Sequence, residues 1–229
     1  MKTGGGSDAA KRRAGERAAE EVEDGMVVGL GTGSTTAYAI EAVGRAVDDG
    51  LAVRGVPTSF SARRLAIERS IPLVGLDEVE RVDLAIDGAD QVADDGALVK
   101  GGGAAHAREK LVAAAADRFV VVADPSKRVD RLERSVPLEV LPDALPVVTR
   151  AVRARSGEPT LREAVHKDGP VVTDNGNLVL DCAFGTIDDP EALATALATI
   201  PGVVEHGLFV DMADTVYVGT DEGLEVLEW

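Results

Sequence analysis

Four short apolar runs, the first three followed by a turn or loop and a stretch with helical periodicity, constrain the fold of this chain more than any other feature. The runs cover residues 26–30, 52–56, 82–86 and 118–123. Continuous apolar runs of this length are typical of strands buried on both faces, as in parallel sheets with helical connections. The pattern therefore predicts a Rossmann-like α/β sheet, and open sheets of this kind bind ligands at the carboxyl ends of their strands.

The connecting segments predict the elements around this sheet. After a flexible tail at Met1–Gly6, Ser7 or Asp8 can cap a helix that runs to about Asp24, where Gly25 would end it. Two more helices and one more strand are expected at residues 34–47, 61–69 and 71–74, respectively.

The second half of the chain is richer in proline and has shorter predicted elements, which indicates a second domain. Prolines punctuate short elements that follow one another as strand, helix, strand, strand, helix and strand, with a hairpin turn at Asp174–Gly176. This order is that of a ferredoxin-like fold, and Thr215–Val218 then reads as a strand that returns to the first sheet. We therefore expect a Rossmann-like catalytic domain at residues 1–134 and 207–229, with a smaller α+β domain inserted at residues 135–206. The expected elements of the insertion are 136–141, 143–155, 160–165, the hairpin around 174–176, 189–200 and a strand near Val203.

The composition bounds the class of protein. Of 229 residues 45% are hydrophobic, which suffices for one large core and a smaller one, and no apolar run is long enough to span a bilayer. The N-terminus lacks the apolar centre of a signal peptide, so we expect a soluble, cytoplasmic protein. The single cysteine, Cys182, excludes an intrachain disulfide and a cysteine-based metal cluster.

The formal net charge of −16 restricts the partners. A field of this sign repels nucleic acids and anionic membranes, so neither is expected to bind. Arginine outnumbers lysine, and acidic pairs recur at expected turns, at residues 48–49, 94–95 and 188–189. This combination suits a protein kept soluble in concentrated salt and predicts a halophile.

The turn after the first apolar run has the composition of an anion-binding site. Residues 31–36, GTGSTT, combine glycines with hydroxyl side chains and precede a helix, whose first N–H groups would face a small phosphate. The turn does not match a dinucleotide motif, because Ser34 stands where G-x-G-x-x-G requires glycine, and it lacks the lysine of a P-loop. The alternative is a purely structural turn in which Ser34 or Thr35 is the helix N-cap.

A dense group of chemically useful residues follows the third apolar run. Two aspartates flank two small residues that allow a tight loop, and a lysine then leads into three glycines. The backbone N–H groups of such glycines can approach a ligand and stabilise developing negative charge. The residues of this group are Asp87, Gly88, Ala89, Asp90, Lys100, Gly101, Gly102 and Gly103.

The helix expected after the glycines carries Glu109 on an apolar face. At about 100° per residue, Glu109 shares this face with Ala105, Val112 and Ala113. A carboxylate on such a face is costly to bury, and desolvation makes a carboxylate a better proton acceptor. Glu109 is therefore either a functional base or one half of a buried ion pair, and the residues alone leave both readings open.

One lysine and the three histidines complete the candidates. Lys127 follows the fourth apolar run, at the same edge of the predicted sheet as Asp87, so it could bind phosphate; a solvated surface lysine is the alternative. The histidines are too dispersed in sequence to indicate a metal site, and a surface or structural role is favoured for each: His106, His166 and His206.

Five segments together resemble type A ribose-5-phosphate isomerases. The similarity covers nearly the whole chain, and the joint pattern is specific although each segment alone is weak. It implies interconversion of D-ribose 5-phosphate and D-ribulose 5-phosphate, an aldose–ketose isomerisation of the non-oxidative pentose phosphate pathway, with no metal and no cofactor. The segments are GLGTGSTT at 29–36, DGAD at 87–90, KGGGAAHAREK at 100–110, ADPSK at 123–127 and VVTDNGNLVLD at 171–181.

The same resemblance implies the roles of the catalytic residues. Glu109 would be the general base, while Asp87, Asp90 and Lys100 would handle the hydroxyls and the carbonyl of the sugar. The chemistry agrees, because moving a proton between two carbons through an enediolate needs one carboxylate that takes and returns it. Lys100 with the N–H groups of residues 101–103 would stabilise the oxyanion.

Binding roles are implied for the remaining candidates. Thr32, Gly33, Ser34 and Thr35 with Lys127 would hold the substrate and its phosphate. Lys11 occupies a position where the family often has another phosphate-binding lysine, although its flanking residues match less well. A homodimer or homotetramer is expected.

Two other functions belong to proteins of similar architecture. A non-catalytic sugar-phosphate sensor would normally carry a helix-turn-helix and a basic patch, and the sequence has neither. A coenzyme A transferase or a sugar-phosphate deaminase is the second rival. The transferase needs a nucleophilic carboxylate, which Glu109 could mimic, but a phosphate-binding turn favours a phosphosugar.

Overall fold

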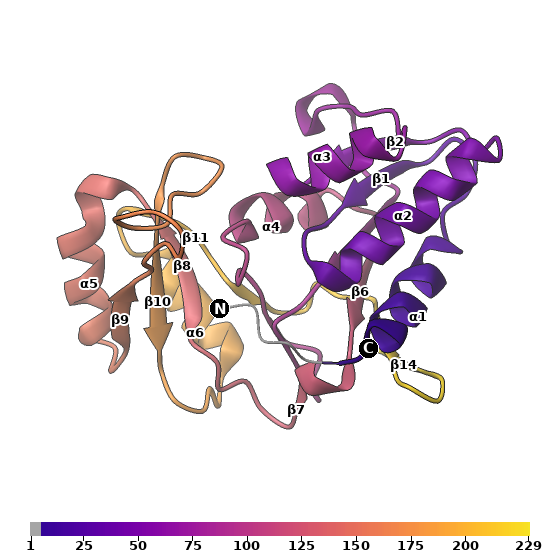
Figure 1. The fold of residues 1–229 in the computed structure, drawn as a ribbon. Helices are drawn as coiled ribbons and strands as arrows, with labels where there is room; N and C mark the ends of the chain where they lie inside the picture. Colours follow the sequence, from indigo (N-terminus) through magenta and orange to yellow (C-terminus); the bar gives the residue numbers. More distant parts are fainter. Residues whose placement is uncertain (1–5) are drawn as a thin grey trace. The chain divides into compact units, whose positions relative to one another are not determined.

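The computed structural model describes residues 6–229, which pack as two compact units (Figure 1). The first unit consists of residues 6–89, Arg108–Arg128 and Met212–Trp229, and the second of Asp90–Ala107 and Val129–Asp211. Apart from Gly6, the tail expected at Met1–Gly6 lies outside the described residues.

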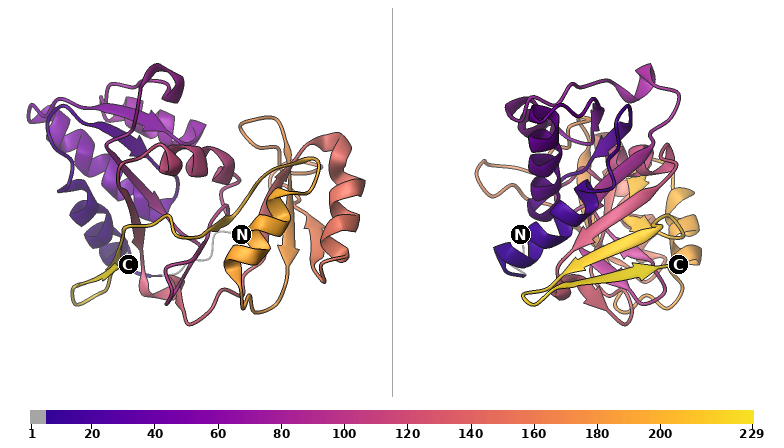
Figure 2. Two further views of the ribbon diagram at one scale, coloured as in Figure 1. Left: turned by 180° about the vertical axis from the view of Figure 1, so that it is seen from behind. Right: turned by 90° about the vertical axis from the view of Figure 1, so that its right-hand side faces the viewer.

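The first unit is built on a six-stranded sheet in the order β14-β13-β6-β3-β1-β2. All neighbouring strands are parallel except the last pair in the chain, β13 and β14, which forms an antiparallel hairpin (Figure 2). The sheet thus includes a strand from the end of the chain, as expected for Thr215–Val218. The strands are β1 (Val27–Leu30), β2 (Arg54–Pro57), β3 (Leu84–Gly88), β6 (Phe119–Ala123), β13 (Thr215–Gly219) and β14 (Leu224–Glu228).

Helices cover both faces of this sheet. Three helices pack on the face to which Val28 and Leu30 point, where they share one core with the strands. The fourth, α4, lies on the other face, because Val112 of α4 is the side chain that a Cβ at Gly29 would meet, and neighbouring residues of a strand face opposite sides. The helices are α1 (Asp8–Ala19), α2 (Ser34–Asp48), α3 (Phe60–Glu68) and α4 (His106–Ala114), and 3-10 turns lie at Leu76–Glu78 and Pro125–Lys127.

Two predicted elements of the first unit are shorter in the structure. Helix α1 has the expected N-cap, Ser7, but it ends at Ala19 instead of Asp24. The carboxylate of Asp24 and the N–H of Gly25 hydrogen-bond to the backbone of Ala52, which pulls this segment away from the helix.

The strand expected at residues 71–74 is reduced to a single bridge between Leu73 and Gly55. Pro72 accepts a hydrogen bond from Gly55 but has no N–H to donate in return, so a regular ladder cannot continue through it.

The second unit contains the predicted ferredoxin-like arrangement. Its elements follow as β8, α5, β9, β10, α6 and β11, and the strands form an antiparallel sheet in the order β11-β8-β10-β9. The elements are β8 (Val136–Val140), α5 (Leu145–Arg153), preceded by a 3-10 turn at Pro142–Ala144, β9 (Glu158–Leu161), β10 (Leu178–Ala183), α6 (Pro190–Ala198) and β11 (Val203–His206).

A second four-stranded sheet, in the order β12-β5-β4-β7, accompanies it. Residues from both sheets share one core. The strands of this second sheet are β4 (Gln91–Ala93), β5 (Leu98–Val99), β7 (Arg128–Val129) and β12 (Leu208–Phe209).

The two units differ in extent from the domains expected at 1–134 with 207–229 and at 135–206. Residues 90–107, 129–134 and 207–211 pack with the second unit instead of the first. The reason is the small sheet, since Leu208 pairs with Val99 and draws the Lys100 segment into the second core. The α/β class and the inserted smaller part are confirmed.

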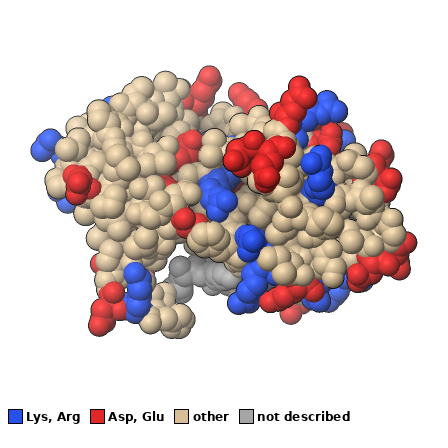
Figure 3. Space-filling view, turned by 90° about the horizontal axis from the view of Figure 1, so that it is seen from above, with Lys and Arg blue, Asp and Glu red and all other residues tan. Residues whose placement is uncertain are grey.

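The surface reflects the acidic composition. Figure 3 shows one face of the molecule, on which Asp and Glu side chains gather in several groups with Lys and Arg side chains between them. Among residues 6–229, no helix combines the length and the apolar character that crossing a membrane requires.

Candidate active site

Asp87 is the carboxylate at the carboxyl end of β3, near the middle of the six-stranded sheet. It is 2% exposed, and its Oδ1 accepts hydrogen bonds from the N–H groups of Gly88 (2.7 Å) and Thr32 (2.9 Å). Because β1 and β3 are adjacent parallel strands, the second bond ties the end of β3 to the turn after β1. The structure therefore brings Asp87, Gly88 and the first turn together, as the sequence predicted.

The turn between β1 and α2 leaves the start of α2 open. Its N-cap is Gly33, with φ of 135°, and in the described structure no side chain caps the helix. The alternative in which Ser34 or Thr35 is the N-cap is wrong, because both residues already lie inside α2. Uncapped N–H groups at the start of a helix form a ready site for an anion.

Two hydroxyl residues beside this turn, Thr58 and Ser59, were not predicted from the sequence as site residues. The Thr32 hydroxyl lies 2.9 Å from that of Thr58 and donates to that of Ser59 at 2.6 Å. Thr58 and Ser59 are buried at the carboxyl end of β2, where Ser59 also caps α3. Both residues directly follow a predicted strand, and this position at a strand's carboxyl end could have identified them as site residues.

Glu109 is buried on α4 at 4% exposure. The face it shares with Val112 and Ala113 is buried, as predicted, and Val112 packs where Gly29 of β1 leaves room. A Cβ at Gly29 would lie 2.5 Å from Val112 Cγ1, so only a glycine allows this approach of α4 to the strand. The carboxylate is thus carried into an apolar layer by the packing of its own helix.

The two candidate phosphate-binding lysines both lie in the first unit. Lys127 is half-buried in the 3-10 turn after β6, where the buried Asp124 carboxylate accepts hydrogen bonds from the N–H and hydroxyl of Ser126. Lys11 is half-buried on α1, which packs against α2; at Gly15 an added Cβ would lie 2.8 Å from the Ala39 N. Partial burial agrees with both readings of Lys127, as a phosphate ligand and as a solvated surface lysine.

Lys100 belongs to the second unit and is 2% exposed. Its N–H donates to the carbonyl of Gly207 at 2.8 Å, and its Nζ lies 5.4 Å from the ring centre of Phe209. A cation over an aromatic face is stabilised when it is withdrawn from water. Gly207, directly before β12, thus binds the backbone of this lysine, and Phe209 of β12 lies beside its ammonium group.

Asp90 and the glycine loop are joined directly. The Asp90 Oδ2 accepts a hydrogen bond from the Gly102 N–H at 2.7 Å, and a Cβ at Gly102 would lie 2.6 Å from Asp90 Oδ1. One of the three amides expected to face an oxyanion is thus already bonded within the protein. The expectation for Gly102 as an oxyanion donor does not fit this contact.

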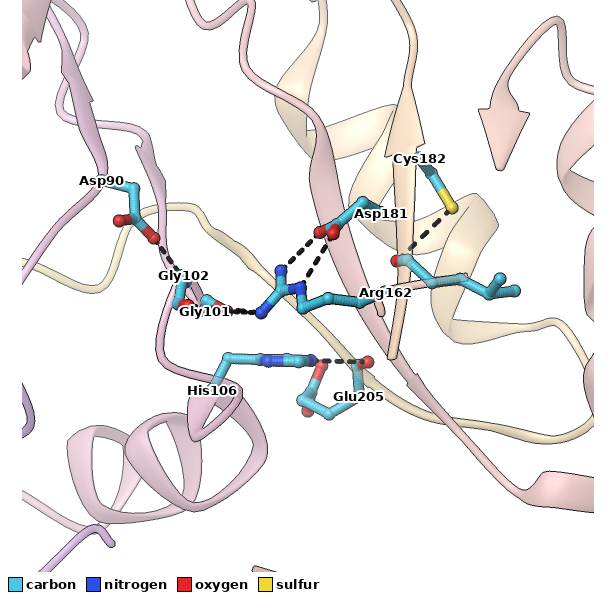
Figure 4. A network of polar contacts seen from close by, with 9 residues as sticks. Asp90, Gly101, Gly102, His106, Arg162, Asp181, Cys182 and Glu205 are labelled. Atoms are coloured by element: carbon cyan, nitrogen blue, oxygen red, sulfur yellow. Dashed lines mark hydrogen bonds and ion pairs between the residues drawn. The ribbon is translucent and has the colours of Figure 1, made fainter. Parts of the chain in front are cut away.

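Arg162 also binds the glycine loop, on the side opposite Asp90, and it was not predicted from the sequence as a site residue (Figure 4). Its Nη1 donates to the carbonyl of Gly101 at 2.8 Å, and its Nε and Nη2 bind both carboxylate oxygens of Asp181, with 2.8 Å for the Nε contact. Arg162 stands 61 positions from Gly101, so no local pattern could have revealed the pair.

The histidines are brought closer than their spacing suggested. His106 Nε2 lies 3.3 Å from the Glu205 carbonyl oxygen, and His206 Nε2 lies 3.7 Å from Glu205 Oε1, whereas His166 is exposed. His106 also fills the space beside Gly101, whose added Cβ would lie 2.7 Å from its Nδ1. Both buried histidines thus pack in the second unit, and no group of metal-ligating side chains occurs within residues 6–229.

The sheet, its strand-end carboxylate and the inserted second unit define a two-unit α/β enzyme of the Rossmann-like type. The family model described as ribose 5-phosphate isomerase A (phosphoriboisomerase A) matches residues 54–223. The chain belongs to the ribose 5-phosphate isomerase A family.

Individual relatives match along nearly the whole chain. Ribose-5-phosphate isomerase A of Halorubrum lacusprofundi is 66% identical, and the match covers 99% of each chain. The solved ribose 5-phosphate isomerase A of Methanocaldococcus jannaschii is 45% identical with a TM-score of 0.92, covering 96% of this chain and 98% of that one. A solved D-ribose-5-phosphate isomerase in complex with phospho-erythronic acid is 46% identical with a TM-score of 0.93 and the same coverage. Halophilic organisms occur among the sources of the relatives, in agreement with the acidic composition.

Proposed function

We propose that this protein interconverts D-ribose 5-phosphate and D-ribulose 5-phosphate through an enediolate, in the non-oxidative pentose phosphate pathway. The observation that carries the proposal is the burial of Glu109 on α4, in a chain that belongs to the ribose 5-phosphate isomerase A family. A solved relative binds phospho-erythronic acid, a phosphorylated hydroxy acid, which supports a phosphosugar as substrate.

The proposed reaction moves one proton between neighbouring carbons. Glu109 takes the proton from C2 of the open-chain aldose, and the electron pair shifts to the carbonyl oxygen to give the enediolate. A second proton passes from the C2 hydroxyl to the C1 oxygen, the Glu109 carboxyl group returns its proton to C1, and the C2 carbonyl of the ketose forms. A general base that shuttles one proton in this way contributes roughly 10²- to 10⁴-fold to the rate.

The other residues bind the sugar and stabilise its charge. Lys100 supplies a positive charge for the enediolate oxygen, and the carboxylates of Asp87 and Asp90 accept hydrogen bonds from sugar hydroxyls and assist ring opening. Gly88 and Ala89 let the loop approach the sugar. Asp87, Gly88 and Ala89 belong to the first unit, and Asp90 and Lys100 to the second.

The phosphate is assigned to the turn at Thr32–Thr35. The open N-terminus of α2 offers N–H groups, and Lys127 supplies a positive charge from the end of β6. Lys11 of α1 is the second lysine in this role. Its helix packs against α2, which supports the assignment.

The remaining expectations stay predictions: a homodimer or homotetramer, no nucleic-acid partner, and a cytoplasmic location. Light scattering of the purified protein would measure the first. The absence of a shift on addition of duplex DNA in a gel-mobility assay would support the second.

Replacing Glu109 with Gln tests the proposed base. The change keeps the size of the side chain but removes the proton acceptor, so kcat for ribose 5-phosphate should fall at least about 10²-fold. Binding of ribose 5-phosphate should stay within severalfold, because the phosphate-binding residues are unchanged. The matched control is Glu68→Gln, an exposed glutamate of α3 that pairs with Arg64, which should keep the parental rate.

Two results would contradict this assignment. Parental turnover by folded Glu109→Gln, purified from a host without its own isomerase, would exclude Glu109 as the base. Collapse of binding with turnover preserved would instead make Glu109 an orienting residue, and Asp87 or Asp90 the better candidate. Parent protein that does not produce ribulose 5-phosphate would exclude the function itself.

A further inference from the structure

The peptide unit between Gly101 and Gly102 is bound at both of its ends. Its carbonyl oxygen accepts from Arg162 Nη1 at 2.8 Å, and its N–H donates to Asp90 Oδ2 at 2.7 Å. No cis peptide bond occurs in the described residues, and in a trans peptide the oxygen and the hydrogen point in opposite directions. Arg162 and Asp90 therefore hold this peptide from opposite sides and prevent it from rotating (Figure 4).

Arg162 is itself rigidly placed. Its side chain is 17% exposed, and Asp181 binds the Nε and Nη2 edge of the guanidinium. Its backbone N–H donates to Val179 at 2.9 Å, and its carbonyl accepts from Val171 at 2.8 Å. A planar guanidinium fixed on one edge by a carboxylate presents its remaining N–H groups in one direction. Here that direction is toward the carbonyls of the glycine loop.

The next peptide unit follows the same orientation. The carbonyl of Gly102 lies 3.3 Å from the same Nη1 of Arg162. Because that peptide is also trans, the N–H of Gly103 points away from the guanidinium. Two N–H groups thus lie on the side of the loop opposite Arg162, those of Gly102 and Gly103. Asp90 binds the first, so the N–H of Gly103 is the one that Arg162 orients toward a ligand.

We propose that Arg162 is a positioning residue that orients the glycine loop, so that the Gly103 N–H donates to the oxyanion of the enediolate. The inference rests on the proposed function. Arg162 draws two carbonyl oxygens, which would repel a developing negative charge, to its own side of the loop. Asp181 acts through Arg162 and has no direct part in the reaction.

The test compares Arg162→Met with Arg131→Met. Arg131 forms an exposed ion pair with Asp188 in the same unit, so its loss removes a charge and an ion pair without touching the loop. Arg162→Met should lower kcat about 10- to 100-fold, somewhat less than the loss of an oxyanion donor itself, with KM changed less than about threefold. Arg131→Met should match the parent in both constants.

A second readout does not depend on activity. Amide hydrogen exchange, measured by NMR, should show that the Gly102 N–H exchanges faster in Arg162→Met while the amides of β8 and β10 keep their protection. Guanidinium added to Arg162→Ala should restore part of kcat, and it should have no such effect on Arg131→Met. Arg162→Lys should lie between parent and Arg162→Met, because an ammonium cannot bind Asp181 and the carbonyl in one plane.

The outcomes separate the possibilities. A kcat of folded Arg162→Met within about twofold of the parent would overturn the inference. Loss of protection throughout β8 and β10, without a selective change at Gly102, would show that Arg162 only stabilises the second unit and would also overturn it. If the parent does not isomerise ribose 5-phosphate, the proposed function fails, and the exchange of Gly102 alone decides whether Arg162 orients the loop.

Discussion

Gly31 and Asp87 approach so closely that no side chain fits between them. A Cβ at Gly31 would lie 2.6 Å from the Asp87 Cα and closer still to its carboxyl group. The carboxyl ends of β1 and β3 thus lie in close contact, and the Asp87 carboxylate fills the space that a side chain at position 31 would need.

Gly31→Ala should therefore displace Asp87 and lower kcat/KM by about 10²-fold, the typical cost of a misplacement of about 1 Å. Gly223→Ala is the control, because an added Cβ there meets nothing within 4 Å. Steady-state kinetics on both variants, after circular dichroism shows that both are folded, measures the difference. Equal activity of the two variants would show that the position of Asp87 does not matter.

Glu139 should be essential for the stability of the second unit. It is fully buried on β8, and its Oε1 accepts hydrogen bonds from Thr173 (2.9 Å), Asn175 (3.0 Å) and Asn177 (2.7 Å). Glu139→Ala leaves these donors without their acceptor and should cost on the order of 3 kcal/mol in the free energy of unfolding. Glu158→Ala, at an exposed position of β9, should cost less than about 0.5 kcal/mol in the same denaturant titration.

The thiol of Cys182 should be unreactive in the native protein. Burial, and secondarily the charge of Asp181, raises the pKa of Cys182 from 9.0 to about 12, so almost no thiolate exists at neutral pH. A thiol reagent should label the native protein slowly and the urea-unfolded protein at once. Rapid labelling of the native protein would contradict the burial of this residue.

Stability should fall in alkaline solution. Burial and the hydrogen bond to Glu21 raise the pKa of Tyr217 from 10.0 to about 12. A group whose pKa is raised in the folded state contributes its stability fully below the unfolded pKa and loses it as the pH rises through the folded value. The free energy of unfolding should thus decline between pH 10 and 12, and Tyr217→Phe should make that decline shallower.

Salt should stabilise the protein. At a net charge of −16 the folded chain repels itself, and screening weakens this repulsion. The melting temperature should rise as potassium chloride increases from dilute to molar concentration. A flat or falling melting temperature would contradict the expected halophilic character.

Exhaustive chelation should leave the isomerase activity intact. The proposed oxyanion donors are Lys100 and a backbone amide, so the reaction needs no divalent ion. The check is the rate of the dialysed protein with and without chelator. Activity that is lost to the chelator and restored by one divalent ion would refute this expectation.

The sequence predicted those parts of the fold that local chemistry determines. Buried apolar runs and turn residues identified the strands of the main sheet, and the hairpin at 174–176 fell between the bridged residues Val172 and Leu178. The end of α1 could not be predicted, because it depends on the contact of Asp24 and Gly25 with Ala52.

The same limit applies to the candidate site. Asp87 and the first turn were predicted together because both end strands of one sheet, and their hydrogen bond follows from that topology. The contact of Asp90 with Gly102 and that of Arg162 with Gly101 join residues from different elements. Periodicity and motif spacing carry no information about such pairs, which depend on the packing of the second unit.

The place of β13 in the sheet has a consequence for the order of synthesis. This strand pairs with β6, and α1 packs so closely on it that a Cβ at Gly219 would lie 3.0 Å from the Ala14 N. A ribosome that has made residues 1–211 has produced every residue of the second unit, while the sheet of the first still lacks two strands. The core of the first unit includes Tyr217, so it is complete only with the last 18 residues, Met212–Trp229, whereas the second unit needs none of them.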